Sequence, residues 1–316
     1  MRGLRGYFIA MSTLIVMSLS GCAYEESDIS VSSAAVSIDN LYAVSQKSSD
    51  EEENTEEHET EEENIIENEE NNDIYTSLIE AKAGDYVLFG SYEQDNEKAN
   101  GAEPIEWIVL DAKDDKILVL SRYVLDKKAF NETDKQVSWA QSTVRKWLND
   151  DFLKLAFSDK EIEHIVTSDI ENPGSAGYFA EFKKKAGTAA GKKTKDKMFL
   201  LSYKEILDYF EPQKIDKFCM YADKDLITIA TIAAQIENKS MPMLEYETFY
   251  KEEGWPKECV GVEGSGWFLR SNGINADDIM SISYAGALRG QYAEYGADYE
   301  KPSYEGGIRP AMWVTR

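Results

Sequence analysis

The stretch GGIRPAMWV at residues 306–314 closes the chain and decides its fold class. From Gly261 onward, short aromatic segments of this kind alternate with Gly and Asn turns, a pattern typical of β-strands. Strand-like segments also open the region 77–316, and helical patterns lie between the two sets. Strands first, helices in the middle and strands last predict an α+β domain.

Three runs rich in β-forming residues open this region. They lie at 86–89, 106–110 and 116–121, and a turn is expected at Asp114-Asp115. Two of these strands should therefore pair as a hairpin. A further strand is predicted at 197–201.

Two helices are expected in the middle of the domain. Apolar residues between Trp139 and Ala156 recur every three to five positions, which places them on one helical face. Ser138 or Ser142 is expected to cap this helix. Ser202 with Glu205 makes a capping box that starts a second, shorter helix.

The segment Leu19-Ser20-Gly21-Cys22 ends an apolar run behind Arg2 and Arg5, an arrangement typical of a bacterial lipobox. A peptidase would cut before Cys22, whose thiol would then carry acyl chains such as palmitate as a membrane anchor. We therefore expect residues 1–21 to be a lipoprotein signal peptide and the protein to face the extracytoplasmic side of the cell membrane. A plain secretory signal or a single membrane span is the alternative, but the run is short for a span of about 20 residues.

Residues 22–76 are expected to form an acidic tether. The part from Ala23 to Thr76 holds 18 Asp and Glu against Lys47 as its one base, and it is poor in aromatic residues. Like charges repel and little apolar area can be buried, so this segment should stay disordered. Binding of divalent cations is an alternative, although the acids lack EF-hand spacing.

The charge of the remaining chain is only mildly acidic. The whole chain carries a formal net charge of −25, whereas residues 77–316 hold 41 acidic and 31 basic residues, a net charge of −10. No nucleic-acid partner is expected, because binding phosphates requires a basic face. The lysine-rich stretch 183–197 has no aromatic residue for base stacking, so it is predicted to be an exposed loop.

Five motifs in order carry a resemblance to one bacterial family. They are Gly84–Tyr92, Pro104–Trp107, Trp139 with Ser142–Asn149, Trp267–Ser271 and Gly307–Trp313. The chain resembles a domain-of-unknown-function family of secreted and surface proteins, whose members typically show Trp-Trp-Leu-Arg-Ser and end on Gly-Val-Arg-Pro-Ala. That ending resembles the C-type-lectin-like superfamily, which includes formylglycine-generating enzymes. The resemblance implies one C-type-lectin-like domain over 77–316, with its first and last strands together and an exposed site in a long loop region. Activity is not implied, because that superfamily hosts sugar binders, protein binders, oxidases and scaffolds.

The chain departs from the family pattern at two places. Gly266 stands where family members carry the first of two paired tryptophans, and 226–255 is a long insertion-like segment with a helical apolar run. Both departures lie close in sequence to the motif that begins at Trp267.

Arg270 and Arg309 lie inside apolar runs, where an unpaired guanidinium would be costly. Each is expected to make a forked pair with a carboxylate or with backbone carbonyls. A functional alternative stays open, in which Arg270, Ser271 and Asn272 lie on a loop beside Trp267 and hold a sugar ring or a peptide carboxylate. Structural roles in the core are expected for Trp313, Trp107 and Trp147.

Cys219 and Cys259 are the thiols that remain after lipidation of Cys22. Two cysteines outside the cytoplasm commonly pair, and family members often carry one Cys before a Tyr-Ala segment and one just before the Trp-rich motif. A Cys219–Cys259 disulfide is therefore expected. Formylglycine-generating enzymes use a cysteine pair for copper-dependent oxidation, but the segments around those cysteines have no match here, so no cofactor is expected.

The histidines and acidic segments predict no metal site and no catalytic triad. His58 lies in the tether, and His164 lies at a helix end among Glu and Ile residues. The segments Glu171-Asn172-Pro173 and 147–150 have the wrong order or context for a lectin-type calcium site. No local motif nominates a carboxylate pair for glycoside hydrolysis.

Two hypotheses of different classes follow for the function. The first is a lipid-anchored surface protein that presents a non-enzymatic domain for binding cell-wall or other glycans, or a protein partner. The second is an extracellular hydrolase acting on polysaccharide or peptide, with Asp277, Asp278 or Glu294 as acid and base. Clustered carboxylates with one raised pKa in a cleft near Trp267 would favour the enzyme, and a flat aromatic and polar surface there would favour binding. A structural or assembly subunit is a third possibility.

Overall fold

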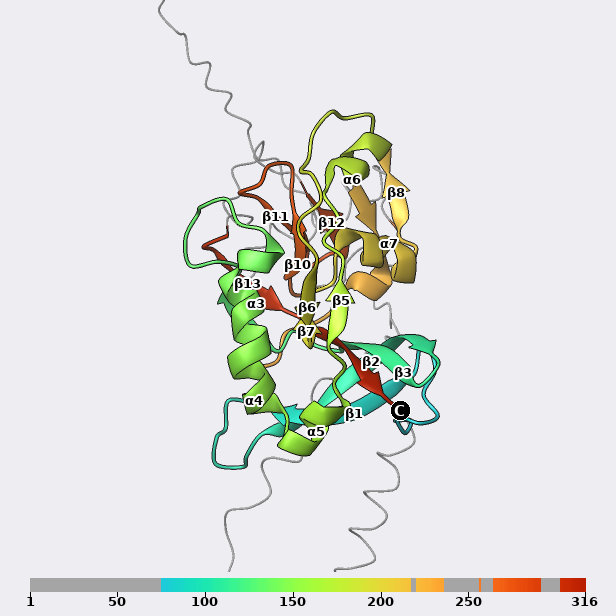
Figure 1. Ribbon diagram of the computed structural model, residues 1–316, viewed down its shortest axis with the longest axis vertical. Helices are drawn as coiled ribbons and strands as arrows, with labels where there is room; N and C mark the ends of the chain where they lie inside the picture. The colour runs from blue at the N-terminus through green and yellow to red at the C-terminus, as the bar shows by residue number, and fades with distance from the viewer. Residues whose placement is uncertain (1–74, 217–219, 236–255, 257–263, 291–301) are drawn as a thin grey trace, which may run out of the picture. The chain divides into compact units, whose positions relative to one another are not determined.

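The computed structural model describes residues 75–216, 220–235, 256, 264–290 and 302–316 (Figure 1). The predicted signal peptide and nearly all of the predicted tether lie outside these residues. All of the described residues belong to one compact unit, Thr60–Arg316. In chain order its elements are β1 (Tyr86–Tyr92), β2 (Glu103–Lys113), β3 (Lys116–Ser121), β4 (Asp126–Ala129), η1 (Trp139–Gln141), α3 (Thr143–Trp147), η2 (Leu148–Phe152), α4 (Leu153–Ala156), α5 (Asp159–His164), β5 (Ser168–Ile170), α6 (Ala176–Glu181), β6 (Thr194–Asp196), β7 (Met198–Phe199), α7 (Tyr203–Phe210), β8 (Gln213–Ile215), β9 (Met220–Ala222), η4 (Lys224–Leu226), β10 (Trp267–Asn272), β11 (Ile279–Ile282), β12 (Ala287–Arg289), β13 (Glu305–Ile308) and β14 (Ala311–Thr315).

The closing stretch supplies strands to two different sheets. Within the described ranges, one sheet has the order β1-β2-β3-β14-β7 and a larger one the order β4-β13-β10-β11-β12-β9-β8, while β5 and β6 pair separately. β13 therefore lies inside the larger sheet and β14 inside the smaller one, and the chain passes between them at Arg309 and Pro310. Mixed helices and sheets confirm the α+β class.

A second segment follows the closing stretch across both sheets. β3 pairs antiparallel with β14, and β4 pairs antiparallel with β13. Residues 116–129 and 305–315 thus form one antiparallel ribbon, which we call the crossing ribbon. Between the register pairs Ala311↔Leu120 and Ile308↔Asp126, five residues on one strand stand opposite two on the other, so the ribbon bulges where it bends.

The predicted helix over 139–156 is present, but a π-helical turn interrupts it. Ser142 caps α3, because its Oγ accepts a hydrogen bond from the backbone nitrogen of Arg145 at 3.3 Å, whereas Ser138 makes no such bond. The turn η2 shifts the helical face, since a π-turn holds more residues than an α-turn. Phe152 is consequently buried, while Leu155, predicted on the apolar face, is 66% exposed.

Of the other predicted elements, two are confirmed and two differ from the prediction. The β2–β3 hairpin is confirmed, with Asp114 at a positive φ of 52° in its turn. The capping box of Ser202 and Glu205 is also confirmed, at the start of α7. The strand expected over 197–201 is only two residues long, as β7. The lysine-rich stretch is not wholly an exposed loop, because its end forms β6.

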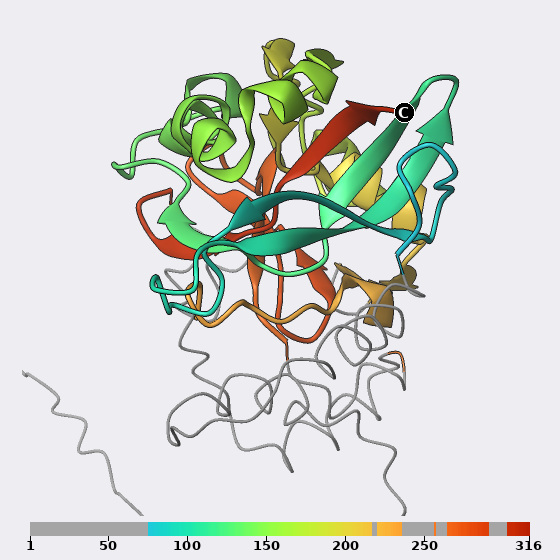
Figure 2. The same ribbon diagram turned by 90° about the horizontal axis from the view of Figure 1, so that it is seen from below.

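Aromatic packing fixes the middle helices on the five-stranded sheet. The ring of Phe152 in η2 lies 4.9 Å from that of Tyr92 in β1, and 5.2 Å from that of Trp147. Figure 2 shows these helices, in green, on one side of the blue-green strands and of β14 in red. In the part of the chain that the structure describes, every helix is too short or too polar to cross a bilayer.

Gly306 in the closing stretch has no room for a side chain. A Cβ added there would lie 2.5 Å from the ring of Phe268, which is buried against Phe130. We expect Gly306→Ala to lower the free energy of unfolding by about 1–3 kcal/mol through overpacking, measured by urea denaturation. The control is Gly266→Ala, whose Cβ would meet its nearest atom at an ordinary 3.4 Å. Equal stability of the two variants would contradict the packing described here.

Candidate functional site

The four predicted ligand-binding residues lie together on strand β10, not on a loop. β10 is flanked by β13 and β11 inside the larger sheet. Trp267 is 1% exposed and donates its Nε1 hydrogen to the carbonyl oxygen of Leu226 at 3.3 Å. Ser271 is 3% exposed, and its Oγ accepts from the backbone nitrogen of Tyr203. The expectation of an exposed loop here is corrected, because sheet pairing and burial leave Trp267 and Ser271 almost no surface for a ligand.

Asn272 at the end of β10 also has its side-chain amide hydrogen-bonded within the domain. Its Nδ2 donates to the carbonyl oxygens of Val137 at 2.8 Å and Ala276 at 3.0 Å. The side chain thus ties the strand to the segment before η1.

Arg270 makes the forked pair that its apolar surroundings predict. Its Nη1 and Nη2 donate to Oε2 and Oε1 of Glu205, the residue that also completes the capping box of α7. Nη1 donates further to the carbonyl oxygen of Leu200, and Nη2 and Nε to that of Glu171. The guanidinium is buried at 3% exposure, and all three of its nitrogens have partners.

Arg309, at the bend of the crossing ribbon, does not make the forked pair that was predicted for it. Its Nε donates to the carbonyl oxygen of Ser121 at 2.7 Å, and the guanidinium lies 4.9 Å above the ring of Trp267. Nη1 is buried without a hydrogen-bond partner among the described residues.

Burial lowers the pKa of Arg309 to about 9, so the group is still charged at neutral pH. The unfolded chain binds this proton more tightly than the folded one, so the buried charge destabilises the fold at neutral pH.

An open hollow of about 650 Å³ lies beside this bend, and Arg309 lines it. We call it the arginine hollow. The lining residues that carry polar groups or rings are Tyr86, Arg122, Tyr123, Tyr209, Phe210, Lys224, Asp225, Thr228 and Arg309. Its walls come from β1, β2, the bulge after β3, the end of α7 and the segment 224–229. The volume lies within the range of small-molecule sites, about 300–1,000 Å³.

Arg122 lies close to the rings of two of the tyrosines. Its guanidinium lies 4.8 Å from the ring centre of Tyr86 and 5.2 Å from that of Tyr123, and Nη1 donates to Oε2 of Glu106 at 2.5 Å. Burial raises the pKa of Tyr123, and the charge of Glu106 raises it further. The tyrosine therefore stays protonated and can donate a hydrogen bond.

Tyr209 adds a second protonated hydroxyl to the lining. Burial, with the charge of Asp111, raises the pKa of Tyr209 to about 12. The arginine hollow thus combines aromatic faces with neutral hydroxyls, cationic groups and one carboxylate, that of Asp225, which pairs with Lys224. Such a lining suits a ligand with a ring and polar substituents.

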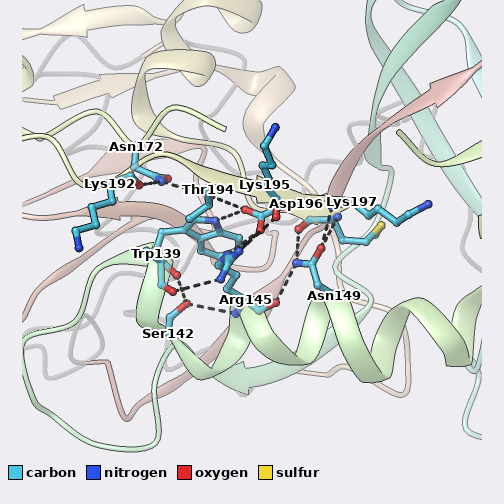
Figure 3. A network of polar contacts seen from close by, with 12 residues as sticks. Trp139, Ser142, Arg145, Asn149, Asn172, Lys192, Thr194, Lys195, Asp196 and Lys197 are labelled. Atoms are coloured by element: carbon cyan, nitrogen blue, oxygen red, sulfur yellow. Dashed lines mark hydrogen bonds and ion pairs between the residues drawn. The ribbon is translucent and has the colours of Figure 1, made fainter. Parts of the chain in front are cut away.

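A second polar cluster, shown in Figure 3, joins the middle helices to the β5–β6 pair. The carboxylate of Asp196 is 0% exposed, and it accepts from Nε1 of Trp139 at 2.9 Å and from Oγ1 of Thr194 at 2.7 Å. Arg145 pairs with the same carboxylate, its Nε 2.7 Å and its Nη2 2.6 Å from Oδ1. Asn149 completes the cluster by accepting from the backbone nitrogens of 197 and 198. The motif over 139–149 therefore performs a structural task.

The remaining predicted residues occupy structural positions or lie outside the described part. Trp107 is fully buried and donates to the carbonyl oxygen of Phe89, whereas Trp147 and Trp313 pack on the core with part of their rings exposed. His164 ends α5, and its Nδ1 lies 2.9 Å from the hydroxyl of Thr315. Cys22, Cys219 and Cys259 lie outside the described residues, so their lipidation and pairing stay predictions.

One group of acids in the described ranges has a geometry that could hold a metal ion. Carboxylate oxygens of Glu93, Asp95 and Glu103 lie within 4.8 Å of one another. Partial desolvation raises the pKa of Glu93, and the charge of Glu103 adds to it. Asp95 and Glu103 accept hydrogen bonds from nearby backbone and amide groups. These bonds within the loop account for the close approach of the acids without a metal ion.

The sequence reasoning named Arg309 but missed the rest of the arginine hollow. Arg122 follows a predicted strand directly, and a charged residue between Ser121 and Tyr123 was the one available signal. Tyr86 and Tyr209 carry no local signal, because they reach the hollow only through the pairing of distant segments.

The chain belongs to the family described as Domain of unknown function (DUF6273), whose model matches residues 114–316. The matched residues include both strands of the closing stretch, while the motifs at 84–92 and 104–107 precede them. Searches of curated proteins and of solved structures each found no match to this chain.

Removing the forked pair between Arg270 and Glu205 should strongly lower the free energy of unfolding. We expect Arg270→Met to lower the free energy of unfolding by about 3 kcal/mol, because Glu205 and two carbonyl groups lose their donor. Lys204→Met is the control on the same helix, since it breaks an exposed ion pair with Asp208 and should cost under about 0.5 kcal/mol. Guanidinium chloride unfolding measures both, and a cost below 1 kcal/mol for Arg270→Met would refute the role assigned to the fork.

Replacing the buried Asp196 should lower the stability of the domain more than replacing Asp169, an exposed acid on the partner strand β5. Asp196→Ala leaves Arg145 without its carboxylate, and we expect a loss of about 3 kcal/mol, at the low end of the buried range because Arg145 keeps 27% side-chain exposure. Asp169→Ala breaks the exposed pair with Lys195 and should leave the thermal midpoint unchanged. Similar thermal midpoints for the two variants would argue against the cluster in Figure 3 as a structural anchor.

Proposed function

We propose that this protein is a lipid-anchored extracytoplasmic protein whose domain, 77–316, is a non-enzymatic binding module with its ligand site in the arginine hollow. The anchor is the expected acyl group on Cys22, and the acidic segment 22–76 serves as the tether. The resemblance of the closing motif to the C-type-lectin-like superfamily supports this assignment of the fold. Glycans, or a protein partner, are the ligand classes.

The observation that carries the proposal is the composition of the hollow. Its lining joins tyrosine rings and arginine side chains around about 650 Å³ of open space. Aromatic faces stack on the apolar face of a sugar ring, and planar donors bind its hydroxyls or acids. Because Arg122 lies close to two rings and is paired with Glu106, this part of the lining is pre-organised, which lowers the entropy cost of binding.

The hydrolase alternative draws on one observation elsewhere in the domain. Glu93 has a raised pKa beside Asp95 and Glu103, as a general acid beside a second carboxylate would. The acids named from the sequence give it less support. Asp278 accepts two hydrogen bonds from Asn275 in a turn, and Glu294 lies outside the described residues.

A ligand screen tests the proposal. We expect saturable thermal stabilisation of the full-length chain, purified in detergent, by at least one member of a panel of peptidoglycan, teichoic acid and soluble glycans. Calcium and chelator should make no difference. Tyr123→Ala should abolish the stabilisation because it removes one wall of the hollow, while Tyr304→Ala, an exposed tyrosine outside the hollow, should not. Stabilisation that survives Tyr123→Ala would place the site elsewhere, and turnover of a glycan would favour the hydrolase.

A further inference from the structure

We propose that the arginine hollow binds a small carboxylic acid, whose carboxylate makes a forked pair with the Nη atoms of Arg309. This inference rests on the binding function proposed above and names the chemical class of its ligand. It follows from the charges of the lining, from a comparison with Arg270, and from the groups around the remaining space.

Charge pairing singles out Arg309 among the cations that line the hollow. Arg122 pairs with Glu106, and Lys224 pairs with Asp225 at 2.6 Å. Arg309 has no carboxylate partner among the described residues, and its one hydrogen bond is to the carbonyl oxygen of Ser121. A buried cation without a counter-charge costs several kcal/mol, so a charge retained in this way calls for an anion that the described residues do not supply.

The other buried arginine among the described residues, Arg270, has the kind of partner that Arg309 lacks there. Arg270 and Arg309 are 3% and 4% exposed, and the Nε of each donates to a backbone carbonyl. The Nη atoms of Arg270 then meet the two oxygens of the Glu205 carboxylate. At Arg309, the buried Nη1 has no hydrogen-bond partner among the described residues, and the residue lines the hollow. A planar carboxylate matches the Nη edge of a guanidinium with two parallel hydrogen bonds.

The other lining residues indicate which chemical group should be attached to the carboxylate of the ligand. Tyr86, Tyr123 and Tyr209 supply rings, and Ile108 and Ile227 supply apolar contacts. A neutral ring or short chain attached to the carboxylate therefore fits the space, as in a sugar acid or a peptide C-terminus. The carboxylate is the shared chemistry, and the probes below separate these two sources.

Matched acid and neutral probes test this proposal on the full-length chain in detergent at fixed ionic strength. The pairs are acetate and acetamide, glucuronate and glucose, and N-acetylphenylalanine and its amide, with inorganic phosphate as a further anion. Using isothermal titration, and thermal shift for the weak acetate pair, we expect the acid of at least one ring-bearing pair to bind at least tenfold more tightly than its neutral partner. Acetate should stabilise the chain where acetamide and chloride do not. The ring-bearing pair that responds identifies the source, and a stronger response to phosphate than to any carboxylate would overturn the assigned class.

Variants then assign the effect to Arg309. Arg309→Met should reduce the acid-to-neutral affinity ratio to about one and abolish the acetate response, while Arg309→Lys should keep part of both. Lys224→Met is the matched control, a lining cation that has its own carboxylate, and should change the ratio by less than threefold. Arg309→Met should leave the thermal midpoint unchanged or raised, in contrast with Arg270→Met, so loss of binding cannot be assigned to unfolding.

The outcomes separate this inference from the function on which it rests. If glycans bind in a Tyr123-dependent manner but acids and neutral probes bind equally, the binding module stands and the carboxylate inference is wrong. Retention of the acid preference in Arg309→Met would also overturn it. An acetate response that depends on Arg309 without any glycan response would support the anion site while removing the glycan ligand.

Discussion

The bend of the crossing ribbon is the constraint on which the rest of this domain depends. Residues 116–129 and 305–315 stay paired while they leave one sheet and enter the other. Ser121 donates its backbone hydrogen to Pro310, and Leu125 donates to Ile308, so the bend is closed on both sides by main-chain bonds. The surplus residues on one strand project Arg122 and Tyr123 beside Arg309. The hollow is therefore a product of the fold's central connection rather than of an added loop.

The two buried arginines of the described residues differ in their protein partners. Arg270 has a full set of protein partners, and its carboxylate also caps a helix, so the group joins β10 to α7. Arg309 is about as deeply buried but has no carboxylate partner within the described ranges, and its buried charge weakens the folded state. Proteins depart from locally favourable arrangements mainly at functional sites, and other parts of the structure offset the cost.

Local patterns predicted the elements well and the site poorly. The hairpin at Asp114, the capping box at Ser202 and the α+β class depend on neighbours within a few residues, and each is confirmed. The forked pair expected for Arg270 is present, whereas the alternative of an exposed loop was wrong, because sheet pairing with distant strands decides burial there. The exposure of Leu155 was missed as well, since an apolar spacing does not reveal a π-turn. Arg309 was named in advance, but its missing partner could only be seen once the segments around it were placed.

The central positions of β13 and β14 also set the order of events when the chain is made. β14 pairs with β3 across a sequence separation close to 200 residues, and β13 pairs with β4 at a similar separation. Contacts this distant in sequence form slowly, because closing so long a loop costs entropy before any pairing offsets it. Neither large sheet can be completed until residues 305–315 have left the ribosome. The nascent chain must therefore keep an edge of β3 and of β4 unpaired from their synthesis until residues 305–315 emerge, open to chaperones and to other strands.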